Sequence, residues 1–319
     1  MKTIFSRAHY MAQLEAFIAL WSGLNDKRGT NLFTPEACYE SSTFGQVTGA
    51  TKVASLLKED FSELDEIELT ATNVIVRADE NKAFAAAYLL GQARKSLSSR
   101  RIQAAHFGGV MILEFDIKGR QPLISIARTQ LTWAEGASIL PPEWNLPTGK
   151  GWQPGDSPAV IVSELDSPWK QVPVSSLPSD EEALIAEVWY RYAWGLDLAD
   201  FAQFAQCFTE NVEAELPPMG TMQGRRILAG TLKAFRMPWP WIQHYGTPVR
   251  VSISADRETA SMILGRIIPG QTELEGEKVY GAHYRIELIK NARGYWQISR
   301  MRYYPGWIAS DFIPDGENA

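Results

Sequence analysis

The chain of 319 residues is poor in cysteine and histidine, with only Cys38, Cys207 and four histidines. Two distant cysteines cannot form a disulfide framework, and neither has the neighbouring ligands of a metal site. Runs of Lys or Arg are missing and the formal net charge is −6, so neither a nucleic acid nor an anionic membrane is an expected partner. Since a phosphate-binding glycine loop is also missing, the sequence predicts a protein that uses no metal and no cofactor.

Long apolar runs are missing too. No stretch approaches the ~18 apolar residues that a membrane-spanning helix needs. Arg7, His9 and Glu15 interrupt residues 1–17, where a signal peptide would have its apolar segment. The chain is 45% hydrophobic and 21% charged, as in folded globular proteins. We therefore expect a soluble, cytoplasmic protein with no membrane partner.

Prolines gather in the middle of the chain, where eight of the 18 lie between Gly136 and Ser179. Such a segment is unsuited to regular structure and is typical of a linker. The sequence on its two sides repeats itself at a nearly constant spacing, which indicates duplication. We predict a first domain over 1–135, a Pro-rich linker over 136–178 and a second domain over 179–319. The matches are Phe33-Thr34 with Phe208-Thr209, Gly49 with Gly224 and Leu57-Lys58 with Leu232-Lys233 at 175, AHF (105–107) with AHY (282–284) at 177, and Trp133 with Trp307 at 174.

The second copy shows the order of its elements most clearly. Ser179 and Glu182 fit an S-x-x-E capping box, and apolar residues then follow at helical spacing as far as Tyr192. Two shorter helical segments follow, the second of them after Gly224. Alternating, strand-like segments complete the copy at 242–254, 259–268, 279–290 and 295–304. Helices followed by a meander predict an α+β fold, namely two tandem cone-shaped barrels whose N-terminal helices pack in a curved, mostly antiparallel sheet.

Three segments of the second copy resemble the nuclear transport factor 2-like superfamily, particularly its SnoaL-like branch. They are YAWGLDLADFAQFAQCFTENV (192–212), GRRILAGTLKAF (224–235) and HYGTPVRVSISAD (244–256). The last is similar to hexachlorocyclohexane dehydrochlorinase, and scytalone dehydratase and bile-acid dehydratases use the same frame. The resemblance implies a hydrophobic small-molecule substrate and a homo-oligomer. It leaves the reaction type open, because this fold hosts lyases, isomerases, cyclases and non-catalytic proteins.

The resemblance also implies a catalytic dyad of Asp197 and His244, with Tyr192 as a third catalytic residue. A neutral imidazole is a suitable base near pH 7, and a carboxylate on one ring nitrogen fixes its tautomer. The phenol of Tyr192 could hydrogen-bond a departing oxygen. A structural interpretation stays open for each residue. Asp197 could be a helix N-cap, His244 a structural histidine beside tryptophans, and Tyr192 a part of its helix's apolar stripe.

Four further residues are candidates for binding the substrate. The aromatic segment 237–241 could line a pocket or cap the barrel. Some superfamily members carry an arginine on the last strand, and that position falls on Met301, so either Arg300 or Arg302 could replace it. Strand alternation puts both arginines on the face opposite Met301, unless a bulge reverses it. The candidates are Trp239, Trp241, Met301 and Tyr303.

The first copy lacks the dyad, because a spacing of 175 residues places Ser22 opposite Asp197 and Leu69 opposite His244. The AHF–AHY match pairs His106 with His283, whose polar strand face favours a non-catalytic role. We therefore expect a degenerate first copy that supports the second.

These patterns favour a cofactor-independent lyase. It would eliminate water, halide or a small carbon fragment such as formaldehyde from a hydrophobic cyclic or aromatic molecule. Two alternatives stay open. One is an isomerase or polyketide cyclase using the same pocket, and the other is a non-catalytic ligand-binding protein.

Overall fold

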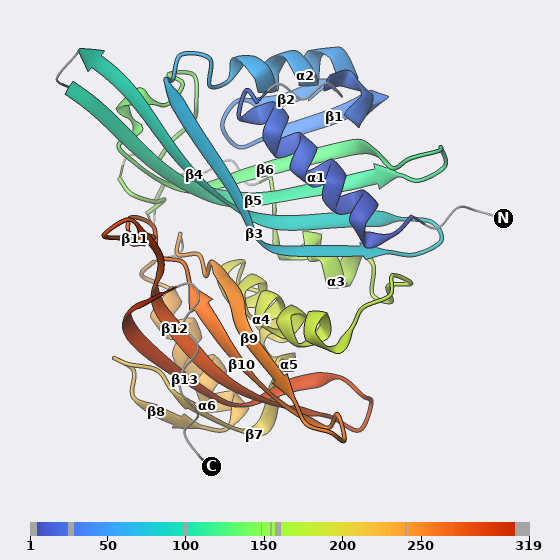
Figure 1. Ribbon diagram of the computed structural model, residues 1–319, viewed down its shortest axis with the longest axis vertical. Helices are drawn as coiled ribbons and strands as arrows, with labels where there is room; N and C mark the ends of the chain where they lie inside the picture. The colour runs from blue at the N-terminus through green and yellow to red at the C-terminus, as the bar shows by residue number, and fades with distance from the viewer. Residues whose placement is uncertain are drawn as a thin grey trace. The chain divides into compact units, whose positions relative to one another are not determined.

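The computed structural model describes residues 5–24, 29–98, 101–147, 149–153, 155–156, 161–239 and 241–309 (Figure 1). The chain divides into two compact units, Met1–Pro178 with Pro240–Ile242, and Ser179–Trp239 with Gln243–Ala319. Each unit combines helices with one mixed sheet, so the predicted α+β class is confirmed. Within these described ranges, none of the helices has the length and apolar character to cross a bilayer.

The second unit places its helices before most of its strands. Its sheet has the order β8-β7-β13-β12-β10-β9, with β11 paired to β12. Neighbouring strands run antiparallel except β7 and β13, which are parallel. Helix α4 packs against β9 and β13. The elements are α4 (Glu181–Asp197), α5 (Phe201–Gln206), β7 (Phe208–Glu215), β8 (Thr221–Gln223), α6 (Arg225–Arg236), β9 (Gly246–Ile253), β10 (Thr259–Arg266), β11 (Glu273–Leu274), β12 (Glu277–Lys290) and β13 (Trp296–Ala309).

The first unit repeats this topology. Its sheet has the order β2-β1-β6-β5-β4-β3, and again one pair, β1 with β6, is parallel. The elements are α1 (Arg7–Trp21), η1 (Gly29–Leu32), β1 (Phe33–Ser41), β2 (Gly45–Thr48), α2 (Ala50–Glu59), β3 (Glu66–Ala78), β4 (Ala83–Ser98), β5 (Arg101–Asp116), β6 (Leu123–Glu135), η2 (Ala137–Ile139), η3 (Glu164–Asp166) and α3 (Pro168–Gln171).

Backbone geometry repeats at the glycines that precede α2 in the first unit and α6 in the second. Gly49 precedes α2 with φ 102°, and Gly224 precedes α6 with φ 91°, values that favour glycine. Each glycine donates its N–H across a distance of 2.8 Å, Gly49 to the carbonyl of Ala37 and Gly224 to that of Val212. Both donors and both acceptors lie 175 residues apart, so the two units share local geometry as well as element order.

Sheet register corrects one of the sequence matches. In the strand register, Arg128 of β6 lies opposite Glu40 of β1, and Arg302 of β13 lies opposite Glu215 of β7 in the same way. Following that register into the next strand places Val110, not His106, opposite His283. The AHF–AHY match is therefore wrong as a structural equivalence. The spacing between the two units changes here because the connecting strands differ in length. The hairpin of β4 and β5 has long strands, whereas in the second unit β10 is short and β11 lies between β10 and β12.

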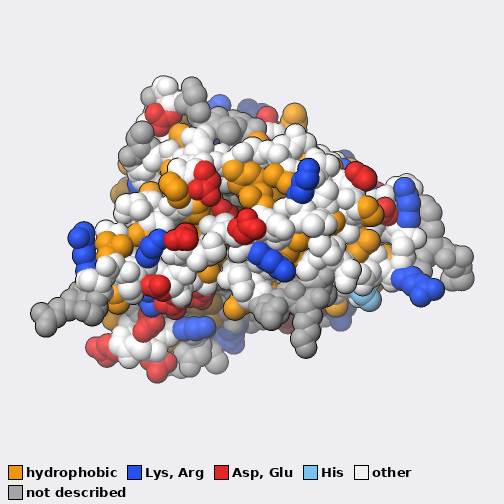
Figure 2. Space-filling model, turned by 90° about the horizontal axis from the view of Figure 1, so that it is seen from above, with side chains coloured by type: hydrophobic (Ala, Val, Ile, Leu, Met, Phe, Trp, Pro, Cys, Tyr) orange, Lys and Arg blue, Asp and Glu red, His pale blue; other side chains and the backbone are white. Residues whose placement is uncertain are grey.

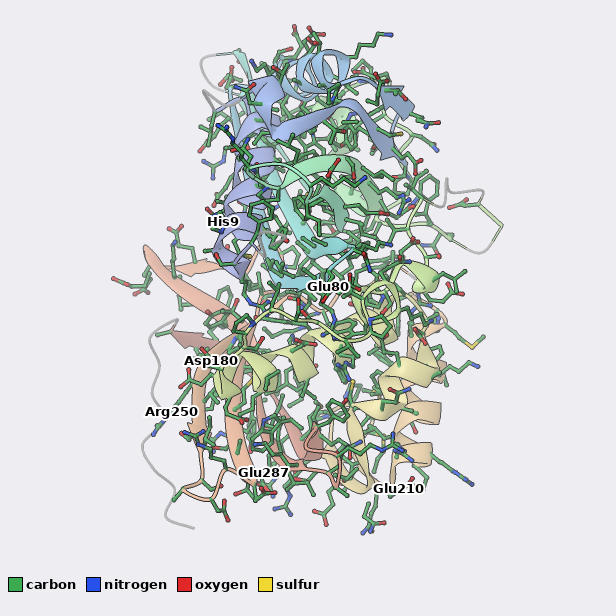
Figure 3. All side chains as sticks on the ribbon, turned by 90° about the vertical axis from the view of Figure 1, so that its right-hand side faces the viewer. His9, Glu80, Asp180, Glu210, Arg250 and Glu287 are labelled. Carbon is green, nitrogen blue, oxygen red and sulfur yellow. The ribbon has the colours of Figure 1, made fainter. Side chains whose placement is uncertain are left out.

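Helix α4 begins one residue later than a capping box at Ser179 would require. Its N-cap is Asp180 (Figure 3), whose side chain accepts a hydrogen bond of 2.7 Å from the N–H of Ala183. Carboxylates are favoured there because they satisfy otherwise unpaired N–H groups. From this start the helix buries Ile185, Trp189 and Tyr192, the apolar stripe that the sequence predicts.

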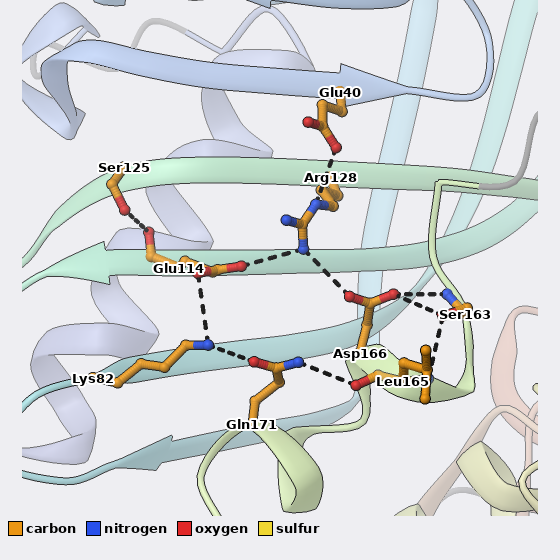
Figure 4. A network of polar contacts seen from close by, with 9 residues as sticks. All are labelled: Glu40, Lys82, Glu114, Ser125, Arg128, Ser163, Leu165, Asp166 and Gln171. Carbon is orange, nitrogen blue, oxygen red and sulfur yellow. Dashed lines mark hydrogen bonds and ion pairs between the residues drawn. The ribbon is translucent and has the colours of Figure 1, made fainter.

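Residues 136–178 fall in the first unit, and side chains hold part of this segment on its sheet (Figure 4). Arg128 on β6 bonds Glu40 at 3.0 Å, Glu114 at 3.2 Å and Asp166 of the Pro-rich segment at 3.4 Å. Lys82, the residue just before β4, donates a hydrogen bond to the side chain of Gln171. We name Arg128, Lys82, Asp166 and Gln171 the latch. Because its arginine contacts three carboxylates and is 19% exposed, it can stabilise the docked segment.

Arg128→Gln is expected to release the latch. Losing charged hydrogen bonds of this kind costs about 1.5–3 kcal/mol, so local opening and cleavage by trypsin after Lys170 should rise roughly tenfold or more. Limited proteolysis with mass spectrometry measures the effect. Arg120→Gln, which removes an exposed arginine of the same unit, is the control. Equal cleavage rates in the variant and the parent would show that Arg128 does not hold the segment.

Charged side chains of both signs are interspersed with hydrophobic ones on the face of the molecule that Figure 2 shows. Such mixing differs from the single-sign basic stripe that marks a nucleic-acid interface. That face therefore offers no reason to revise the partners expected from the composition.

Candidate active site

His244 and Asp197 meet in the second unit. His244 lies just before β9 and Asp197 is the last residue of α4. The Nδ1 atom of His244 is 2.6 Å from Oδ1 of Asp197, and the N–H of His244 donates to Oδ2 at 2.7 Å. Asp197 is 4% exposed and His244 is 8% exposed. One carboxylate thus holds both the ring and the backbone of the histidine, and this pair is the candidate dyad.

The alternative of Asp197 as an N-cap does not apply. The N-cap of α5 is Asp200, whose side chain accepts a hydrogen bond of 3.1 Å from the N–H of Gln203. Asp197 instead ends the preceding helix, and its carbonyl accepts hydrogen bonds from Arg236 at the end of α6. Its carboxylate is therefore directed to His244.

This contact determines the chemistry available to the imidazole. An ionised carboxylate only accepts hydrogen bonds, so the ring nitrogen facing it carries the proton. In the neutral ring, Nε2 then has the lone pair that can take a proton. The carboxylate also stabilises the imidazolium that such a transfer forms. The arrangement is that of a general base with a fixed tautomer.

Tyr192 lies beside the dyad and is paired with a second tyrosine. Its ring centroid is 5.9 Å from that of His244, edge to face at 88°, and it stacks on Trp189 at 4.8 Å. Burial raises the pKa of Tyr192 well above its usual range and that of Tyr284 to about 12. A hydrogen bond between them further raises the pKa of Tyr192 and lowers that of Tyr284, as expected when Tyr192 donates. Both phenols therefore stay protonated near neutral pH.

Tyr303 and the two arginines Arg300 and Arg302 all lie on β13, but they make different contacts. Tyr303 is half-buried, with its ring 4.9 Å from that of Tyr284, whereas Met301 is completely buried. Arg300 bonds Glu213 at 2.8 Å and Arg302 lies 3.6 Å from Glu215, so neither takes the place of an arginine at Met301.

A register shift on the same strand breaks the simple alternation. Pairing between β12 and β13 slips between Glu287 and Leu288. Ile298 and Trp296 are consequently buried, although alternation alone would place them with the arginines. The shift lies before Met301, so it does not bring the arginines onto the face of Tyr303.

The two candidate tryptophans make other contacts. Trp239 is 43% exposed and packs on Phe235, with ring centroids 5.2 Å apart. Trp241 belongs to the first unit, where a Cβ on Gly151 would lie 2.1 Å from its Cγ. The Nζ of Lys150 lies 5.6 Å from the Trp241 ring centroid. Their role in substrate binding stays a prediction.

Arg266, at the end of β10, is a site residue that the sequence did not single out. It is 8% exposed, and its guanidinium bonds the carbonyls of Gln243 at 2.5 Å and Tyr245 at 2.7 Å, on either side of His244. Its charge also lowers the pKa of Tyr284, against the larger effect of burial. The available signal was a lone arginine in the otherwise apolar run MILGRII (262–268).

His283 lies on a different face of β12 from Tyr284. Its ring stacks on Tyr304 at 4.9 Å and 9°, with the guanidinium of Arg285 5.0 Å from the same tyrosine ring. Burial, and then the nearby Arg285, lower the pKa of His283. This histidine therefore sits in an aromatic stack, apart from the candidate dyad.

The equivalent positions of the first unit carry different residues. The register places Leu69 opposite His244 and Leu89 opposite Arg266. The 175-residue spacing between the two units places Ser22, at the end of α1, opposite Asp197, at the end of α4. The Ser22 hydroxyl donates a hydrogen bond of 2.9 Å to the carbonyl of Ile18 in α1. All three residues are at most 9% exposed. The first unit thus has the frame of the second without the dyad at this place.

Among the residues that the structure describes, no three His, Cys, Asp or Glu side chains gather in a group that could hold a metal ion. The groups around His244 are a carboxylate, phenols and a guanidinium, and their chemistry is proton transfer and hydrogen bonding.

Residues 179–302 match the family model of the SnoaL-like domain. The second unit therefore contains a SnoaL-like domain of the nuclear transport factor 2-like superfamily, which confirms the resemblance seen in the sequence. No curated protein matches the chain.

Solved structures are similar over about two fifths of the chain. Kfla4162 from Kribbella flavida is 12% identical, covers 42% of this chain and 95% of its own, and has a TM-score of 0.38. Hexachlorocyclohexane dehydrochlorinase LinA-type3 from Novosphingobium barchaimii is 11% identical, covers 40% and 88%, and has a TM-score of 0.36. Rv3472 from Mycobacterium tuberculosis, a protein of unknown function, is 22% identical, covers 44% and 80%, and has a TM-score of 0.31.

Proposed function

We propose that the second unit is a cofactor-independent lyase that acts on a hydrophobic cyclic or aromatic small molecule. It eliminates water, halide or a small carbon fragment such as formaldehyde. The observation that carries the proposal is the contact of 2.6 Å between His244 and Asp197, in a domain of a superfamily that includes lyases. A buried histidine held this way has the tautomer and the support that a general base needs.

The proposed step begins with proton transfer to Nε2 of His244. The electron pair of the broken C–H bond forms a C=C bond as the bond to the leaving group on the adjacent carbon breaks. When formaldehyde leaves, the proton comes instead from a hydroxyl, whose oxygen forms the C=O bond of the departing fragment. The remaining carbon then takes up a proton from the imidazolium. Asp197 stabilises the imidazolium in both cases.

The paired phenols are suited to a departing or developing oxygen anion. Burial raises the pKa values of Tyr192 and Tyr284, so both phenols keep their protons near neutral pH, and Tyr284 donates its proton to such an oxygen. Tyr303 lies against Tyr284 and is proposed to contact the substrate. Burial of the group keeps water away and strengthens these polar contacts.

The same phenol pair favours one second candidate, an isomerase. A base that removes a proton beside a carbonyl leaves an enolate, which the phenols could stabilise until His244 returns the proton to another carbon. The two functions differ in their products. A lyase product has lost the mass of water, halide or the carbon fragment, whereas an isomerase product has the mass of its substrate.

Three probe compounds test the proposal. 5-Nitrobenzisoxazole reports base-promoted elimination by absorbance, 4-hydroxy-4-phenylbutan-2-one reports loss of water, and hexachlorocyclohexane reports loss of chloride. The parent protein is expected to turn over at least one of these compounds. His244→Ala should lower that turnover by about 10²-fold or more. Turnover by the parent should persist in EDTA and in reducing agent. Turnover equal in the parent and the variant, or restored only by added Zn²⁺ or Mg²⁺, would contradict this mechanism.

A further inference from the structure

The segment that carries His244 lies outside the regular sheet. Residues 243–245 precede β9, whose first pair joins Gly246 to Arg266 of β10. Regular pairing therefore begins only after His244. Other contacts must fix the position of the imidazole, which a base needs to within about 0.5 Å.

Arg266 supplies two of those contacts. Its Nη2 donates to the carbonyl of Gln243 at 2.5 Å, and its Nη1 donates to that of Tyr245 at 2.7 Å. The planar guanidinium is a rigid fork, so two bonds to carbonyls on either side of one residue restrict the rotation of the peptides between them. Asp197 holds the N–H and the ring of the same residue. His244 is thus bound through its ring, its N–H and both flanking carbonyls.

We propose that Arg266 is a positioning residue for His244, clamping residues 243–245 so that the imidazole stays aligned with Asp197. The inference rests on the proposed function, since alignment matters only if His244 acts as a base. Arg266 acts through the backbone and is distinct from the residues proposed to touch the substrate.

The first unit supports this assignment through an internal comparison. In the same register, Leu89 takes the place of Arg266, while Leu69 and Ser22 take the places of His244 and Asp197. The clamp is therefore missing from the copy that lacks the dyad. A buried leucine at the equivalent position also shows that this frame accommodates a leucine, which makes Arg266→Leu a suitable variant.

The test compares Arg266→Leu and Arg266→Lys in the full-length protein. The hydrogen-bonded Nδ1–H proton of His244 gives a downfield NMR signal, identified by its loss in His244→Gln. In Arg266→Leu we expect this signal to weaken or shift, and kcat on the probe that the parent turns over to fall about 10²-fold with KM within about twofold. Lysine keeps the charge but cannot span both carbonyls, so Arg266→Lys should recover only part of the loss.

Arg250→Leu is the matched control, because Arg250 is an exposed arginine on β9 (Figure 3). A folded Arg266→Leu variant with unchanged NMR signal and kcat would overturn the proposal, as would a rise in KM at constant kcat. If Arg266→Leu does not fold, parental signal and kcat in Arg266→Lys overturn it. The NMR readout does not depend on turnover. If Arg266→Leu loses the signal while His244→Gln keeps full activity, the proposed function is refuted, but the positioning of His244 by Arg266 is supported.

Discussion

Replacing His244 with alanine is expected to lower kcat by about 10²–10⁴-fold, the contribution of one positioned acid or base. Asp197→Asn should cost a similar amount or more. The asparagine amide can donate to Nδ1, which would move the ring proton to Nε2 and remove the lone pair that accepts the substrate proton. Steady-state kinetics on the probe that the parent turns over measures both effects, with circular dichroism to establish that the variants fold.

The two residues should behave as one unit. If Asp197 acts only through His244, the double variant should be little slower than the slower single variant. Asp200→Asn is a matched control, because Asp200 is a buried acid three residues later that caps α5. It should lower stability by about 1 kcal/mol or less and leave kcat close to that of the parent. Multiplicative losses in the double variant would mean that Asp197 and His244 work separately, and unfolding of the single variants would favour a structural histidine.

The sequence predicted those parts of the site that depend on local pattern. Tyr192 and Asp197, which the family resemblance singled out, lie five residues apart on one helix, so local structure alone keeps them close along the chain. His244 comes just before a segment whose alternation marks a strand. The repeat of Gly49 at Gly224 also concerns local geometry, since each glycine begins a helix with a φ that favours glycine. Such features need no knowledge of pairing between distant strands.

Arg266 and Tyr284 could not be found in that way. The acceptors of Arg266 lie 21 and 23 residues away, and only the register of β9 against β10 brings them together. Tyr284 reads as one more apolar residue of its strand until the register sets it beside Tyr192. The same limit explains the AHF–AHY error, because a triplet carries no information about strand pairing. The slip that buries Ile298 is likewise set by packing of β12 on β13.

We expect the intact chain to bind its small-molecule ligand at one site only, in the second unit. The two units have the same topology, but at the equivalent described positions the first unit has other residues. Ser22, Leu69, Leu89 and Met111 stand there in place of Asp197, His244, Arg266 and Tyr284. Isothermal titration calorimetry with a non-reactive analogue of the best probe should therefore give a stoichiometry near one. Tyr284→Leu should abolish binding, whereas Met111→Leu, at the equivalent position of the first unit, should leave it unchanged. Comparing these two matched substitutions shows which unit binds the ligand while the chain stays intact.

Installing the missing residues should not create a second site. In the first unit, Ser22→Asp, Leu69→His and Leu89→Arg would put polar groups at positions that are now at most 9% exposed. A buried charge without full hydrogen bonding costs about 3–5 kcal/mol, and nothing has shaped the surrounding side chains to hold the new groups within the ~0.5 Å that catalysis requires. The triple variant should melt at lower temperature and still bind one ligand. Two equivalent sites in the parent, or binding lost through changes around Leu69 but not around His244, would mean that the first unit carries the function.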